Sequence, residues 1–133
     1  MRDEQDGTTL TNVTVSVTPQ STNGTEVVCN FSGGAVTDDA IFLGLNEPYD
    51  LTFNLVNGPG GAYTFDTNNT PFCNQSNHCP APNAPIKKPY SLNPTPTANS
   101  ITVHVDPVPS RSVTHYRLNF SGGYSCDPII VHD

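Results

Sequence analysis

Hydrophobic and polar residues alternate along much of this chain, which is the pattern of β-strands that bury one face. The clearest example is residues 10–18, in which Val13, Val15 and Val17 lie on one face and polar side chains on the other. Similar runs stand between turns rich in glycine, proline and asparagine. They predict further strands at residues 26–31, 40–45, 50–56, 100–106, 113–120 and 127–133.

These strands predict an all-β fold, a single Greek-key β-sandwich of about seven or eight strands with essentially no helix. Residues 19–24 and 107–110 are the expected hairpin turns. Residues 1–9 are expected to form a flexible N-terminus and residues 10–133 the sandwich domain. Between residues 80 and 96 the chain contains six prolines, which favour a crossover rather than a strand.

The sequence Asn-Phe-Ser-Gly-Gly occurs twice, at residues 30–34 and 119–123. Each copy is followed by an acidic turn and an aliphatic run, with Asp38 and Asp39 in the first copy and Asp127 in the second. Each copy predicts the end of a strand, a Gly-Gly turn that tolerates positive φ, and an acidic turn that opens the next strand.

Four stretches carry a resemblance to known proteins: residues 49–65, the Pro-Phe pair at 71–72, residues 116–120 and residues 127–131. Together they resemble small uncharacterised bacterial β-sandwich proteins of cupredoxin-like or Ig-like shape, which implies the sandwich fold. Cupredoxins hold copper with two histidines, a cysteine and usually a weak axial methionine. Here no Cys-x-x-His sequence or downstream methionine accompanies His115 and Cys126, so we expect no cofactor.

A weaker metal site is conceivable on the predicted hairpin of residues 100–106 and 113–120. If the alternate valines face the core, His104 points outward and lies opposite His115. Two imidazoles can bind a divalent transition metal weakly. The alternative is two solvated histidines that titrate near neutral pH, because no third ligand is visible.

The four cysteines are even in number and contain no Cys-x-x-Cys pair, which favours disulfides. Cys73 and Cys79 can close a small polar loop, which leaves Cys29 and Cys126 for a long-range bond. Four cysteines allow three pairings, and the other two stay open. A zinc site that uses His78 and Cys79 is an alternative, but a second pair of ligands at metal spacing is missing.

The start of the chain lacks the basic, apolar and small-residue regions of a signal peptide, and no stretch is long enough to span a membrane. Asn-x-Ser/Thr sequons and the cysteines nevertheless favour an extracytoplasmic or secreted protein. The sequons begin at Asn12, Asn23, Asn30, Asn68, Asn74 and Asn119.

Charge and motifs exclude several classes of function. A net charge of −7 argues against a nucleic-acid partner. The chain has no Gly-x-Ser-x-Gly sequence, no phosphate-binding loop ending in lysine and no His-Glu-x-x-His. We therefore expect a non-enzymatic protein.

Two functional hypotheses follow. The first is a structural or protein-interaction module that docks to another copy or another protein through exposed strand edges, with residues 10–18 and 129–133 as the candidate edges. The second is a module that binds a small ligand, most plausibly a carbohydrate. Its candidate residues are Tyr49, Tyr63, Asn68, Asn69 and Tyr90.

Overall fold

A computed structural model describes residues 10–59, 61–68, 71–75, 86, 88–92, 96–127 and 129–133 of the chain. This part contains eleven strands and no helix, which confirms the all-β prediction. The strands are β1 (Thr11–Asn23), β2 (Glu26–Ser32), β3 (Val36–Thr37), β4 (Ala40–Leu43), β5 (Tyr49–Leu55), β6 (Phe72–Gln75), β7 (Tyr90–Leu92), β8 (Ser100–Val105), β9 (Ser112–Phe120), β10 (Tyr124–Cys126) and β11 (Ile129–His132).

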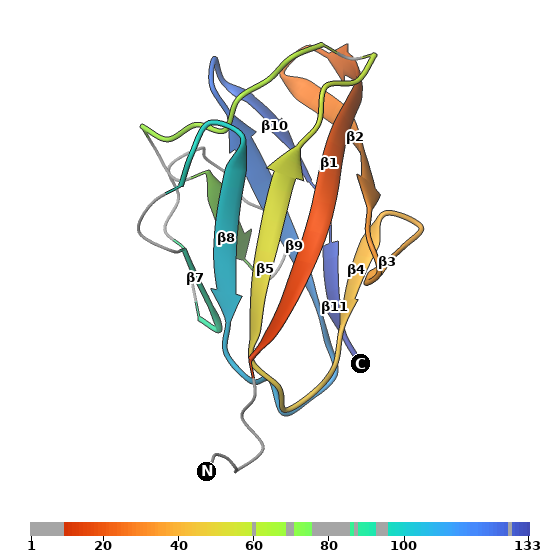
Figure 1. The fold of residues 1–133 in the computed structure, drawn as a ribbon, viewed down its shortest axis with the longest axis vertical. Coiled ribbons are helices and arrows are strands. Elements are labelled where there is room, and N and C mark those ends of the chain that lie inside the picture. The colour runs from red at the N-terminus through yellow and green to blue at the C-terminus, as the bar shows by residue number, and fades with distance from the viewer. Residues whose placement is uncertain are drawn as a thin grey trace.

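The strands form two packed layers joined by continuous hydrogen bonding. Their order is β3-β4-β11-β9-β10-β2-β1-β5-β8-β7, and β6 pairs with β9. In Figure 1 the strands β8, β5 and β1 lie in the near layer, and β9 crosses behind them. Most pairs are antiparallel, but β1 with β5, β4 with β11 and β2 with β10 are parallel. The arrangement agrees with the predicted sandwich.

The core lies between the layers and follows the alternation seen in the sequence. Along β1 the side chains of Val15 and Val17 are buried, and along β8 those of Ile101, Val103 and Val105. Their neighbours in the strands are more exposed, because successive side chains of a strand point to opposite faces.

Three aromatic rings connect the two layers. Phe53 of β5 comes from the near layer, and its ring centroid lies 5.7 Å from that of Tyr116 of β9 and 6.3 Å from that of Phe72 of β6. The Phe72 and Tyr116 rings stack at 5.1 Å. All three side chains are fully buried, so this cluster holds the two layers together by dispersion and the hydrophobic effect.

Several predicted connections differ in the structure. Strand β1 continues through residues 19–23 instead of turning there, because a bulge between Pro19 and Ser21 accommodates the proline. Residues 107–110 are not a hairpin turn: β8 pairs with β5 and β7, and β9 pairs with other strands. Within the predicted crossover, Tyr90–Leu92 form β7 and pair with β8.

The duplicated sequence occupies equivalent places in the fold. After the first copy come a glycine turn, β3, the Asp38-Asp39 turn and β4; after the second come a glycine turn, β10, Asp127 and β11. Asn30 and Asn119 are 89 residues apart in the sequence, and so are Ile41 and Ile130, which pair in parallel. The strands that follow the two copies therefore lie side by side in matching register.

The first Gly-Gly turn is held close to β1. Gly33 has φ of +151°, and a Cβ atom there would lie 2.5 Å from the Thr14 carbonyl oxygen. Gly34 has no atom within 4 Å of an added Cβ. The prediction of a turn that needs glycine is therefore confirmed at Gly33, where close approach and backbone conformation both exclude a side chain.

Gly33→Ala is expected to lower the free energy of unfolding by roughly 2–3 kcal/mol, because the new methyl group meets the β1 backbone in an unfavourable φ region. Gly34→Ala is the matched control and is expected to change stability by less than about 1 kcal/mol. Urea unfolding of both variants measures the difference. Equal losses would show that Gly33 does not constrain the turn.

Candidate functional site

Among the residues that the structure describes, strand β1 has no partner on one side of its first five residues. Residues Thr11 to Val17 pair with β5 on one side, but pairing with β2 begins only at Ser16. The reason is local: β2 ends at Ser32, and the glycine turn then directs the chain toward β4 in the other layer. We call residues 11–15 of β1 the open edge.

A groove of about 430 Å³ runs beside the open edge. It is lined by Asn12, Val13, Thr14, Gly34, Ala35 and Phe42. None of these side chains is charged. Phe42 is 44% exposed, and Leu10, which precedes β1, is 42% exposed. Exposed backbone donors and acceptors next to an uncharged, partly apolar groove are the features that another strand uses when it adds to a sheet.

The structure revises both predicted edges. The prediction for residues 10–18 holds for residues 11–15, because Ser16 and Val17 pair with both β2 and β5 and Thr18 pairs with β2. The prediction for residues 129–133 is wrong, because β11 pairs with β4 on one side and with β9 on the other. Sequence reasoning missed this because an aliphatic strand near the chain end has the same alternation whether it is an edge or an interior strand.

Of the five residues proposed to bind a small ligand, the four that the structure describes are not brought together. Tyr49 is buried, and its hydroxyl accepts a hydrogen bond of 2.7 Å from the Gly44 backbone N–H. Tyr90 is buried against Phe72, whereas Tyr63 packs against Phe120 and Tyr124. Asn68 is exposed in a turn, and Asn69 lies outside the described residues.

The two histidines proposed as metal ligands are also apart. His104 of β8 lies opposite Asp50 and Ser91, while His115 of β9 lies opposite Ile129 and Gln75. The prediction that they face each other is wrong because β8 and β9 belong to different layers. Instead, the ring of His104 bridges two carboxylates, with Nδ1 2.9 Å from Asp50 Oδ1 and Nε2 3.2 Å from Asp106 Oδ1.

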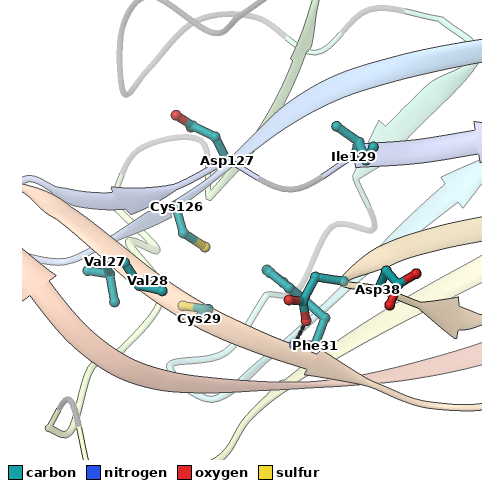
Figure 2. A pocket seen from close by; sticks show the side chains of 9 residues that line it. Val27, Val28, Cys29, Phe31, Asp38, Cys126, Asp127 and Ile129 are labelled. Carbon is teal, nitrogen blue, oxygen red and sulfur yellow. Dashed lines mark hydrogen bonds between the residues drawn. The ribbon is translucent and has the colours of Figure 1, made fainter.

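The cysteines divide into two groups. Cys73 is disulfide-bonded, and Cys79, its predicted partner, lies outside the described residues. Cys29 of β2 and Cys126 of β10 are buried free thiols, so the bond predicted between them is not formed in this structure. Figure 2 shows their sulfur atoms pointing toward each other, and both residues line a cavity of about 360 Å³.

The aspartates of both acidic turns lie at the same cavity. Asp38 and Asp39, which connect β3 to β4 with φ of 50° and 63°, line one side. Asp39 Oδ1 accepts a hydrogen bond of 3.0 Å from the Phe31 backbone N–H, which fixes the turn. Asp127 lines the other side, and its Oδ1 accepts a hydrogen bond of 3.2 Å from Arg117 Nε.

His132 is a buried histidine that the sequence analysis did not single out. Its side chain is 1% exposed, its ring centroid lies 6.4 Å from that of Tyr90, and neither ring nitrogen has a hydrogen-bond partner among the described residues. Burial lowers the pKa of His132 below its usual 6.5. The alternation of Ile130 and His132 on one face of β11 was the signal available in the sequence.

No metal-binding or membrane-spanning element is found in the part of the chain that the structure describes. There, no three histidine, cysteine, aspartate or glutamate side chains lie close enough to hold a metal ion. The same residues include no helix that is long and apolar enough to cross a membrane. Comparison with models of known protein families gives no match, and no curated protein is similar in sequence.

Protonation of His132 is expected to destabilise the fold. Its folded pKa is lowered, so the unfolded chain binds the proton more tightly, and stability falls as the pH drops below about 6.5. Because a single proton is involved, the free energy of unfolding can fall by at most about 1.4 kcal/mol per pH unit. His132→Leu is expected to reduce this slope in urea unfolding curves measured between about pH 7 and 5.

His115→Leu is the control for this experiment, because His115 is exposed on β9 and its loss is expected to leave the slope unchanged. If His132→Leu keeps the full slope, the acid sensitivity arises from another group.

Proposed function

We propose that this chain is a non-enzymatic structural or protein-interaction module that self-associates through the open edge of β1. The observation that carries the proposal is the open edge, residues 11–15, which has no partner among the described residues on one side and lies next to an uncharged groove. Natural edges are usually protected by charges, prolines or bulges. The open edge carries none of these, since the bulge of β1 comes later, at Pro19.

A second copy of the chain is the partner that the charge pattern favours. The net charge of −7 makes two copies repel each other over most of their surfaces. Residues 10–18 contain no charged side chain, so two copies can approach along this strand with little repulsion. An antiparallel pair of open edges related by a two-fold axis satisfies the backbone groups of both copies and covers Leu10 and Phe42.

Three further parts of the proposal rest on separate observations. The absence of hydrolase and phosphate-binding motifs supports a non-enzymatic role. The disulfide-bonded Cys73 supports an extracytoplasmic location, because disulfides persist in oxidising compartments. The two packed layers of mainly antiparallel strands support a Greek-key arrangement of cupredoxin-like or Ig-like shape.

The proposal predicts a dimer whose population rises with protein concentration. Asn12→Glu places a carboxylate from each copy at the shared edge, so the dissociation constant is expected to rise about fivefold or more, since a like-charge cross-strand pair costs roughly 1 kcal/mol. Size-exclusion chromatography with light scattering over a wide concentration range measures the dissociation constant.

Thr25→Glu is the matched control, because it adds the same charge at an exposed turn at the other end of β1. Its dissociation constant is expected to stay close to that of the unmodified chain. A monomer at every concentration, or equal effects of the two substitutions, would rule out association through the open edge.

A further inference from the structure

We propose that Cys29 and Cys126 form a reversible dithiol site, which a small cationic disulfide oxidises to a bond that joins the two layers. The site is separate from the open edge, and it does not depend on self-association.

The two thiols lie at the weakest junction of the sheet. β2 and β10 share a single residue pair, Glu26 with Ser125, supported by a hydrogen bond of 3.0 Å from the Ser125 N–H to the Thr25 carbonyl oxygen. Cys126 follows Ser125 directly, and Cys29 lies three residues beyond Glu26. A bond between the sulfurs therefore adds a covalent link where backbone pairing is minimal.

The two side chains already contact each other. Both are buried, with 8% and 5% of their surfaces exposed, and their sulfur atoms converge (Figure 2). A hydrogen bond between the thiols is the main reason that the pKa of Cys126 is raised, and burial adds to the effect. This contact brings together two residues that are far apart in the sequence, as disulfide formation requires.

The cavity beside the thiols determines which reagent can reach them. Its walls include the apolar side chains of Val27 and Ile129 and the three carboxylates of Asp38, Asp39 and Asp127. Negative charge at the entrance attracts a cation and repels an anion. A small disulfide with terminal amines, such as cystamine, is therefore preferred over oxidised glutathione, which carries carboxylates.

The reaction is a pair of thiol–disulfide exchanges. One protein thiolate attacks a sulfur of the small disulfide, forms a mixed disulfide and releases one small thiolate. The second protein thiolate attacks the protein sulfur of that mixed disulfide and releases the other small thiolate. The two protons lost by the cysteines end on the two released thiols, so two protein thiols are oxidised and one small disulfide is reduced.

The neighbours of the thiols make their oxidation depend on pH. Asp127 adds to the raised pKa of Cys126, Asp38 and Asp39 face the same cavity, and the buried Tyr116 interacts with both thiols. Because the thiolate is the attacking species, the oxidation rate is expected to increase with pH above neutrality.

The experiment treats the full-length chain with cystamine at about pH 8, where more thiolate forms. Remaining thiols are then alkylated under denaturing conditions. Peptides cleaved before Asp50, which separates Cys29 from Cys73, and after Lys87, which separates Cys73 from Cys126, are analysed by mass spectrometry. The expected result is a Cys29–Cys126 cross-linked peptide pair. It should form several-fold faster with cystamine than with oxidised glutathione and should disappear with reductant.

Oxidation is also expected to raise Tm by about 10 °C, because the bond closes a long loop of the unfolded chain. The single variants Cys29→Ala and Cys126→Ala each retain one thiol and should show no such rise. Recovery of both cysteines as alkylated thiols, as separate mixed disulfides, or bonded to Cys73 or Cys79 would overturn the proposal. The cross-link analysis uses the unmodified chain, so its result stands even if a cysteine variant fails to fold.

Discussion

The packing of Phe53 against Phe72 and Tyr116 is the contact on which the rest of this structure depends. It joins rings from both layers at centroid distances between 5.1 and 6.3 Å, and all three side chains are fully buried. Strands from distant parts of the chain must cover these rings on both sides. The chain therefore has to cross between layers, and each crossing interrupts the pairing of the strand it leaves.

The segments that follow the two copies of the duplicated sequence each produce one of the features that we connect with function. After the first copy, the turn at Gly33 carries the chain away from β1 and leaves residues 11–15 unpaired on one side. After the second copy, β10 reaches β2 through one residue pair and brings Cys126 beside Cys29. One local motif, used twice, thus creates an open edge and a narrow junction.

The candidate sites show the limits of reasoning along the chain. His104 and His115 belong to alternating strands that follow each other in sequence, so a hairpin is the simplest arrangement. The structure instead pairs β8 with β5, which gives His104 a carboxylate partner in Asp50. For the same reason, the aromatic residues proposed to bind a ligand were identified by type, whereas the burial of Tyr49 and Tyr90 depends on the fold.

Local sequence patterns were enough to predict the strand-rich character of the protein, most strand positions, the buried face of each long strand and the glycine turn at Gly33. These features are local, because side-chain alternation and backbone φ depend on a few neighbouring residues. The choice of neighbouring strands became visible in the three-dimensional structure. This structure showed that β11 is interior, that β1 has an open edge at residues 11–15, and that Cys29 meets Cys126. Strand pairing joins residues far apart in the chain, and the same alternating pattern is compatible with many partners.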